Sequence, residues 1–405
     1  MASSSPATPA LRVAIVAGET SGDLLGAALI DALRARIPDL EAVGVAGPRM
    51  RAAGCEMLAD AHQLSVMGLF EVLPHLPRLL RLRARLTEQI AARHPDVFIG
   101  VDYQQFNLGL ARRLKSRGLT TVQYVSPQVW AWRQGRVRTI GRAFDLVLCL
   151  LPFEPDFYRE HAVLAQFVGH PLADQIPMQA DRGAARSALG LDPQATVIAL
   201  LPGSRLGEVQ RLAAPFLRAA ALLMQRRPQL VLIAPMAGAE VRRAFERALA
   251  ALPATLAVRV LDGQARTALT AADAAMVASG TATLEALLCR CPMVVAYRFA
   301  SVTALLLRAL RMVRLPNFAL PNLLAGEQLA PEFLQEAVRP EPMAQALERL
   351  LDDGPRRQYL LQRFQSIHAT LQKKGAALAA EAVLQLLRAR TGRSFDIEHA
   401  DRGGG

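Results

Sequence analysis

Apolar and polar positions alternate along the chain in two different rhythms. Short runs that are apolar almost throughout, such as Leu11–Val16 and Ala274–Ala278, predict buried strands, whereas longer stretches with one apolar face, such as Leu24–Arg36, predict helices. The same two rhythms predict eight more strands and two more helices: strands at Asp96–Val101, Thr120–Val125, Leu146–Leu150, Phe167–Val168, Thr196–Leu201, Val231–Ala234, Ala257–Leu261 and Met293–Tyr297, and helices at Arg78–Arg93 and Leu108–Arg117. Strands that alternate with helices predict an α/β fold with parallel sheets.

The alternation runs in two series, separated by a polar stretch around residues 171–190 that we interpret as a linker. This pattern predicts two Rossmann-like domains, over residues 1–172 and 190–375. Residues 376–390 form a predicted C-terminal helix that could pack back on the first domain, and residues 391–405 form a tail. Because ligands of open parallel sheets bind at the carboxyl ends of the strands, two such domains facing each other would form a cleft.

The composition narrows the class of protein. The chain has 405 residues, of which 52% are hydrophobic, and this excludes a disordered chain. The formal net charge is +12, and nearly all the basic residues are arginines, which suit phosphorylated substrates, anionic membranes or nucleic acid; an arginine-rich genome would explain them equally well. The four cysteines lack zinc-ligand spacing and predict buried thiols. Without a signal peptide or a bilayer-spanning stretch, a cytoplasmic protein is expected.

Three motifs in the first half directly follow predicted strands. Residues 17–23 (Ala-Gly-Glu-Thr-Ser-Gly-Asp) form a glycine-containing turn that could admit a ligand close to the backbone, or a plain turn capped by Thr20 or Ser21. Asp102 ends a very apolar strand, where a carboxylate suits a general base, or serves as a helix N-cap. Residues 124–133 hold both tryptophans, Trp130 and Trp132, which could form a sugar or acyl platform or pack beneath the loop.

Two motifs in the second half have the same placement. In residues 200–205 (Leu-Leu-Pro-Gly-Ser-Arg), Arg205 at a helix start could bind a diphosphate together with backbone N–H groups. In residues 278–285, Gly280 and Thr281 could donate to phosphate oxygens, and Glu285, four positions after Thr281, could accept from a ribose diol. Together these groups suit a nucleotide sugar. Walker, Gly-x-Gly-x-x-Gly and Gly-x-Ser-x-Gly patterns are absent from these motifs.

The motifs at residues 17–23, 124–133, 201–205, 279–285 and 320–326 closely resemble those of lipid-A-disaccharide synthases, and the resemblance runs from about residue 12 to about residue 388. It implies a GT-B glycosyltransferase that condenses UDP-2,3-diacylglucosamine with 2,3-diacylglucosamine 1-phosphate, releasing UDP and a β-1,6-linked disaccharide 1-phosphate. Two positions depart from the family's usual pattern: Gln105 replaces a second aspartate, and Glu327 replaces an arginine.

The resemblance and the motifs together give a set of expected site residues. Asp102 is the expected catalytic base. The expected UDP- and donor-binding residues are Ser204, Arg205, Gly280, Thr281, Glu285 and Asn322, and the expected acceptor-side residues are Gly18, Glu19, Ser21 and Trp130. Because arginine and helix N-termini can stabilise a leaving diphosphate, neither a metal ion nor another cofactor is expected.

Acylated substrates require a protein that reaches the cytoplasmic face of the inner membrane as a peripheral protein. The two expected contact segments are Met67–Leu73, which is followed by Arg78, Arg81, Arg83 and Arg85, and the arginine-containing stretch Ser301–Arg314. The alternative for both is an ordinary amphipathic helix that faces the core, and for Ser301–Arg314 this alternative is favoured. The resemblance leaves a homodimer open. Competing functions are a UDP-sugar 2-epimerase, another GT-B transferase, or a nucleotide- or RNA-binding protein, although no RNA-binding motif is present.

Overall fold

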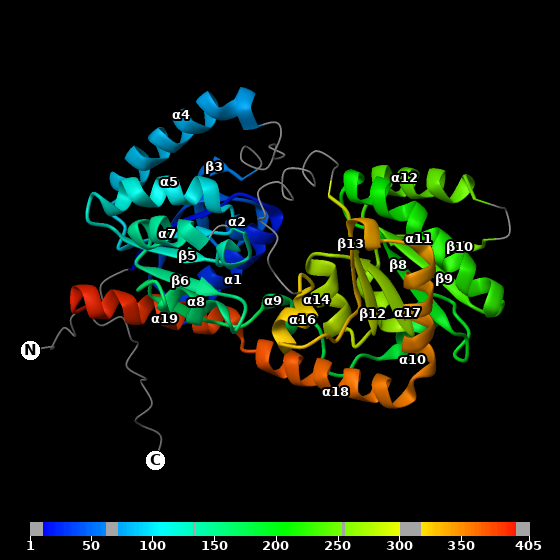
Figure 1. The fold of residues 1–405 in the computed structure, drawn as a ribbon. Helices are drawn as coiled ribbons and strands as arrows, with labels where there is room; N and C mark the ends of the chain where they lie inside the picture. The colour runs from blue at the N-terminus through cyan, green and yellow to red at the C-terminus, as the bar shows by residue number, and fades with distance from the viewer. Residues whose placement is uncertain (1–10, 62–71, 133, 253–255, 300–316, 394–405) are drawn as a thin grey trace, which may run out of the picture. The chain divides into compact units, whose positions relative to one another are not determined.

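Residues 11–61, 72–132, 134–252, 256–299 and 317–393 are described in the computed structural model (Figure 1). The chain divides into two compact units: unit 1 contains Met1–Pro171 and Leu371–Gly405, and unit 2 contains Leu172–Thr370. Each unit has its own parallel sheet with helices packed on it, which confirms the predicted α/β class with two parallel sheets.

The sheet of unit 1 has seven strands in the order β3-β2-β1-β4-β5-β6-β7. Their bounds are β1 Arg12–Ala17, β2 Glu41–Ala46, β3 Cys55–Asp60, β4 Val97–Val101, β5 Thr120–Tyr124, β6 Leu146–Cys149 and β7 Ala165–Phe167. The chain moves outward from β1 to β3 and then returns to pair β4 with β1. The strand order therefore reverses between β1 and β4, which is where ligands of such sheets bind.

Helices cover both faces of this sheet. Their bounds are α1 Thr20–Arg34, α2 Pro48–Ala52, α4 Val72–Ala91, α5 Gln104–Lys115, α6 Val129–Trp132, η1 Gln134–Arg136, α7 Val137–Ala143, α8 Glu154–Arg159 and, at the other end of the chain, α19 Gly375–Thr391. Val13 and Ile15 of β1 face a core shared with α1 and α19, whereas Ala14 and Val16 face a core shared with α5 and α7. The C-terminal helix α19 thus packs beside α1 and buries Val383, among others, in the core of unit 1.

The sheet of unit 2 has six strands in the order β10-β9-β8-β11-β12-β13, so its order reverses between β8 and β11. The strand bounds are β8 Val197–Leu201, β9 Val231–Met236, β10 Val258–Asp262, β11 Ala274–Ala278, β12 Met293–Tyr297 and β13 Glu332–Leu334. The helix bounds are α9 Pro171–Gln175, α10 Arg182–Ala188, α11 Leu206–Arg226, α12 Ala239–Ala250, α13 Ala265–Ala271, α14 Thr281–Leu288, α16 Leu320–Ala325, η2 Gln335–Ala337, α17 Pro340–Asp352 and α18 Gly354–Leu371.

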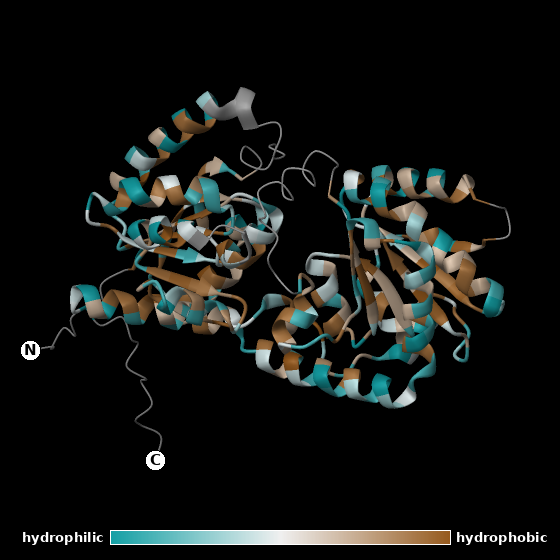
Figure 2. Cartoon of the chain, viewed as in Figure 1, coloured by the Kyte–Doolittle hydropathy of each residue, from teal (hydrophilic) through white to brown (hydrophobic). Residues whose placement is uncertain are grey.

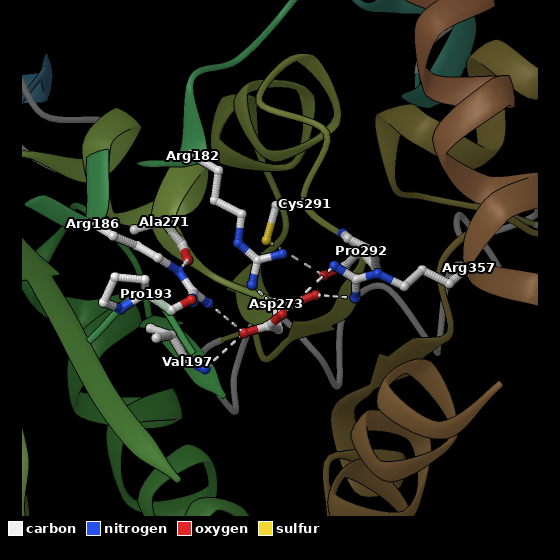
Figure 3. Close-up of polar contacts among 9 residues, drawn as sticks. All are labelled: Arg182, Arg186, Pro193, Val197, Ala271, Asp273, Cys291, Pro292 and Arg357. Atoms are coloured by element: carbon white, nitrogen blue, oxygen red, sulfur yellow. Dashed lines mark hydrogen bonds and ion pairs between the residues drawn. The ribbon is translucent and has the colours of Figure 1, made fainter. Parts of the chain in front are cut away.

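The stretch at 171–190 differs from the predicted linker. It contains α9 and α10, and α10 packs on α13 within unit 2. Figure 3 shows the reason: the Asp273 carboxylate, just before β11, accepts hydrogen bonds from Arg182 and, at 2.9 Å, from both Arg186 and the Val197 amide, while Arg357 donates to the Asp273 carbonyl at 2.7 Å. A polar segment was interpreted as a linker, but its arginines fasten it to the sheet at the end opposite the motifs.

Most predicted strands are confirmed to within two residues, and Ala274–Ala278 and Met293–Tyr297 match β11 and β12 at both ends. Figure 2 shows the hydrophobic residues concentrated on the strands and on the helix faces against them. All four cysteines are free and buried, as predicted. In the described ranges, no helix combines the length and the apolar character needed to cross a bilayer.

Candidate functional site

The motifs of unit 1 lie at one edge of its sheet, namely the edge formed by the carboxyl ends of its strands. Residue pairing places Ala17 of β1 beside Val101 of β4, and Val101 beside Tyr124 of β5. The three loops that follow these strands therefore emerge next to one another at the point where the strand order reverses. This is the position expected for a ligand site in an open parallel sheet.

Asp102 stands at the centre of this edge and contacts the first motif. The Ser21 hydroxyl donates to Oδ2 of Asp102 at 3.3 Å. Partial burial raises the pKa of Asp102 above its usual range, and hydrogen bonds from Ser21 and from the Tyr103 backbone act in the opposite direction. The alternative role as an N-cap is wrong, because α5 has Tyr103 at its N-cap and no side-chain cap. A half-buried carboxylate with a raised pKa suits proton abstraction.

Gly18 lies beneath the ring of Tyr103. A Cβ at position 18 would be 2.5 Å from Tyr103 Cγ, so only glycine fits there. Glu19 is exposed and is the N-cap of α1, without a side-chain cap bond. The alternative in which Thr20 or Ser21 caps α1 is therefore wrong, and the Ser21 hydroxyl is directed to Asp102 instead.

Asp23, the last residue of the first motif, has a structural role. It is 3% exposed, and its carboxylate accepts from the amides of Gly47 (2.8 Å), Arg49 (2.9 Å) and Met50 (3.0 Å) at the start of α2. A carboxylate at this position satisfies the free N–H groups of the α2 N-terminus. Asp23 thus fixes α2 to α1 beneath the site.

Trp130 is anchored by the buried carboxylate of Glu154, a residue that was not singled out from the sequence. Its indole Nε1 donates to Glu154 Oε1 at 3.1 Å, and its ring meets Phe153 edge-on with the centroids 4.9 Å apart. The Leu151 amide donates to Glu154 Oε2 at 3.0 Å. Burial raises the pKa of Glu154 to about 7, although the surrounding donors, including the Ser126 hydroxyl, favour the ionised form.

In unit 2, the loop after β8 is closed by Glu208. Its Oε2 accepts from the amides of Ser204 at 3.2 Å and Arg205 at 3.3 Å. Gly203 has a φ of 132°, and a Cβ there would be 2.4 Å from that of Glu208. The expectation that these amides are ready to bind a diphosphate is therefore wrong in this conformation. The Arg205 side chain remains 84% exposed, with Nη1 3.9 Å from Glu208 Oε1.

The loop after β11 adjoins this one in the sheet, because β11 pairs with β8. Gly280 has a φ of 148° and nothing within 4 Å of where a Cβ would lie, and Thr281, the first residue of α14, is exposed. Glu285 lies one turn later, with Oε1 3.7 Å from Nε of Arg266. This arrangement presents a helix N-terminus and a carboxylate together, which suits a phosphate and a diol.

Asn322 is fully buried, and its amide is committed within unit 2. Its Nδ2 donates to the Ala330 carbonyl at 2.8 Å and to Glu332 Oε1 at 2.7 Å, and its Oδ1 accepts from the Leu329 and Ala330 amides at 2.8 Å. Direct contact with a ligand, as the sequence suggested, is not supported by this geometry. Asn322 instead holds the segment from α16 to β13 in place.

Each residue that departs from the expected motif has a polar partner. Gln105 Oε1 accepts from Arg136 at 2.9 Å. Glu327 accepts from the Tyr359 hydroxyl at 2.7 Å and from Arg363 Nε at 2.8 Å. These two partners hold the pKa of Glu327 below its usual range. The carboxylate of Glu327 is thus bound to cationic and hydroxyl groups of α18.

Tyr297, at the end of β12, was not singled out from the sequence. Its ring packs edge-on against Phe299 with the centroids 4.9 Å apart. Burial, followed by the charge of Glu208, raises the pKa of Tyr297. Its position as the last residue of a predicted strand was the available signal.

Two Rossmann-like sheets with ligand loops at their carboxyl ends define a GT-B-type fold, and solved structures share it. A calicheamicin glycosyltransferase, CalG4, aligns with a TM-score of 0.56 at 17% identity, over 95% of this chain and 100% of that chain. A UDP-GlcNAc 2-epimerase from Neisseria meningitidis, solved with UDP-GlcNAc, aligns with a TM-score of 0.59 at 10% identity, over 94% and 100%.

Sequence comparison narrows this class to one family. The family model for lipid-A-disaccharide synthetase matches residues 13–386. The lipid-A-disaccharide synthase of Alkalilimnicola ehrlichii is 54% identical over 92% of this chain and 98% of its own length, and that of Pseudomonas aeruginosa PAO1 is 52% identical over 94% and 99%. The chain belongs to the lipid-A-disaccharide synthase family and is a glycosyltransferase of lipid A biosynthesis.

Proposed function

We propose that the chain transfers a 2,3-diacylglucosaminyl group from its UDP derivative to the 6-hydroxyl of 2,3-diacylglucosamine 1-phosphate, with inversion at the anomeric carbon. Family membership supports the reaction class. The observation that carries the mechanism is Asp102, a half-buried carboxylate at the switch point of a parallel sheet, held by the Ser21 hydroxyl.

The proposed step is a single displacement. Asp102 takes the proton of the acceptor 6-hydroxyl while that oxygen bonds to the anomeric carbon of the donor. The bond from this carbon to the β-phosphate oxygen breaks, and UDP leaves with the electron pair. The α-linked donor thereby gives a β-1,6-linked disaccharide 1-phosphate. The raised pKa of Asp102 favours this role, because a more basic carboxylate removes a hydroxyl proton more readily.

Unit 2 supplies the proposed donor site. The exposed guanidinium of Arg205 and the first-turn amides at Gly280 and Thr281 would bind the diphosphate and stabilise the charge that develops on it. Glu285, held near Arg266, would accept from the ribose hydroxyls. Ser204 belongs to the loop that Glu208 anchors, and we assign Asn322 a positioning role instead of a ligand contact.

Unit 1 supplies the proposed acceptor site. Gly18 lies against the Tyr103 ring next to Asp102, Glu19 follows it as the exposed N-cap of α1, and Ser21 orients the Asp102 carboxylate. Trp130 offers an aromatic surface on the neighbouring loop, anchored by Glu154. An indole ring that is held through its Nε1 leaves an aromatic face that can pack against a hydrophobic or sugar face of an acylated glucosamine.

Peripheral binding to an anionic membrane surface is a further part of this proposal. Arg78, Arg81 and Arg85 of α4 are exposed, whereas Arg83 lies against Gly109 of α5. Ser301–Arg314 and Met67–Glu71 of the other expected segment lie outside the described residues. Exposed arginines attract anionic lipid headgroups, and salt weakens that attraction. We expect co-sedimentation with phosphatidylglycerol vesicles that 1 M salt, at which the Debye length is about 3 Å, reverses; salt-insensitive binding would contradict this part.

The reaction is tested by following UDP release from UDP-2,3-diacylglucosamine with and without the acylated acceptor. The proposal predicts release that depends on the acceptor, and a product whose anomeric proton coupling in NMR shows the β configuration. A UDP-sugar 2-epimerase would convert its donor without an acceptor. Acceptor-independent turnover, or an α-linked product, would contradict the proposal.

A further inference from the structure

Three neighbouring residues without a glycine's freedom adopt left-handed backbone conformations at the carboxyl ends of β4 and β5. The φ angles are 51° at Asp102, 27° at Tyr103 and 77° at Val125. Such conformations are strained and persist only where the surrounding structure holds them. The β-branched Val125 is the least tolerant of the three.

Two buried amides supply the holding contacts. Asn107 of α5 and Gln123 of β5 are both 0% exposed. Asn107 Nδ2 donates to the Asp102 carbonyl at 3.1 Å, and Gln123 Nε2 donates to the same oxygen at 3.0 Å. Gln123 Nε2 also lies 3.2 Å from the Val125 carbonyl. Two donors from different elements thus converge on the carbonyl of the proposed base.

The oxygen atoms of these two side-chain amides lack a hydrogen-bond donor in the described part of the chain. Asn107 Oδ1 and Gln123 Oε1 are buried and have no hydrogen-bond partner among the described residues. A buried acceptor left unpaired destabilises the folded state. Apolar side chains would fill these positions without that cost, so the donors, not the overall stability of the core, explain why amides stand here.

We propose that Asn107 and Gln123 are positioning residues, which hold the Asp102 backbone in its left-handed conformation and so direct its carboxylate to the acceptor hydroxyl. The inference rests on the proposed role of Asp102 as the base. Neither amide needs to touch substrate, because both act on the carbonyl of Asp102 from inside the protein.

A substitution at Gly100 tests the contact between Asn107 and the Asp102 carbonyl independently. This residue lies in β4, and a Cβ there would come within 2.8 Å of Asn107 Cβ and 3.0 Å of its Nδ2. Alanine at position 100 should therefore displace the Asn107 side chain from the Asp102 carbonyl without removing any polar group. Glycine within a strand often marks such a close approach.

The test is a set of double mutants scored by kcat. Asn107→Leu and Gln123→Met keep the approximate shape of each side chain and remove its donor. Each should lower kcat by about 10- to 100-fold, the scale expected when a reacting group is misplaced by about 1 Å. In an Asp102→Asn background, the same substitutions should change the residual kcat by less than about twofold, since residues that act through one group are not additive.

Two controls separate positioning from a loss of folding. Thr121→Val, on the same strand, removes a buried hydroxyl that donates to the Ala143 carbonyl at 2.8 Å, and it should lower the unfolding temperature but leave kcat near that of the wild type. Gly100→Ala should lower kcat in the wild type and have little further effect after Asn107→Ala.

The outcomes distinguish the inference from the function beneath it. Equal fold-losses of kcat with and without Asp102 would overturn the positioning role while leaving Asp102 as the base. A fully active Asp102→Asn variant would overturn the base assignment, and the positioning role with it.

Discussion

The Ser21 hydroxyl donates to Oδ2 of Asp102 at 3.3 Å, although 81 positions separate the two residues in the sequence. Parallel pairing of β1 with β4 brings the loops that carry them to the same edge of the sheet. Ser21 is thus the one exposed side chain of the first motif that we find bonded to the proposed base in the described part of the chain.

Replacing Ser21 with alanine should shift the pH dependence of turnover. The hydrogen bond from Ser21 favours the ionised carboxylate, so its loss should raise the pKa of Asp102 beyond the rise that burial already causes. A base must be ionised, so activity falls as the pH drops through that pKa. The acid limb of the kcat/KM profile should therefore move to higher pH in Ser21→Ala and stay in place in Thr20→Ala. An unmoved limb in Ser21→Ala would exclude this coupling.

Glu154 should make the stability of unit 1 depend on pH. Its pKa is about 7 in the fold, above the usual value of 4.5, so the native state binds the proton more tightly than the unfolded state does. The stabilisation is complete below about pH 4.5 and is lost as the pH rises to about 7. Urea midpoints followed by tryptophan fluorescence report on unit 1, which contains both tryptophans. The midpoint of Glu154→Gln should fall less between pH 5 and pH 8 than that of the wild type; equal slopes would contradict this assignment.

Glu208→Ala should weaken donor binding without removing any group expected to touch the donor. The substitution releases the Ser204 and Arg205 amides and removes a helix-cap interaction worth about 0.5–2 kcal/mol. Arg205 then loses its anchored loop, and the Kd for UDP, measured by calorimetry, should rise. Glu240→Ala, in the first turn of α12, is the matched control and should leave the Kd unchanged. Tighter UDP binding by Glu208→Ala would mean that Glu208 competes with phosphate.

Asn322→Ala separates a positioning role from a ligand contact. Loss of the side chain leaves the buried amides of Leu329 and Ala330 without their acceptor, so the unfolding free energy of unit 2 should fall by about 1–3 kcal/mol. UDP affinity should decline only to the extent that the segment from α16 to β13 becomes less well held. If thermal unfolding followed by circular dichroism were unchanged while UDP binding was lost, Asn322 would be a direct ligand.

Most strands of the two sheets were predicted from the sequence, but the edge strands β3 and β13 were not. Strands β11 and β12 are continuous apolar runs, which periodicity identifies well. Strand β3 was missed because it lies at the edge of its sheet and is half-exposed, and β13 because it has only three residues. The buried strand β2 was missed as well, because three of its six residues are Ala or Gly, which are weak strand formers. Short or polar edge strands carry little periodic signal.

The residues of the candidate site were likewise predicted only in part. Asp102 and Gly280 were predicted from their place after strands. The roles of Gln123 and Glu154 were not, because a buried polar residue inside an apolar run shows no partner until the fold brings α5, β5 and the tryptophan loop together. Asp23 stood in a motif, but its partners at Gly47 and Met50 belong to a helix that only the tertiary structure places beside it.

Asp102→Asn is the most direct test of the central claim, because it removes the base and keeps the shape of the side chain. Steady-state UDP release should fall by about 10²- to 10⁴-fold, the usual contribution of a general base, while the Kd for UDP stays within about twofold of the wild-type value. Turnover near that of the wild type would contradict the assignment of Asp102 as the group that deprotonates the acceptor.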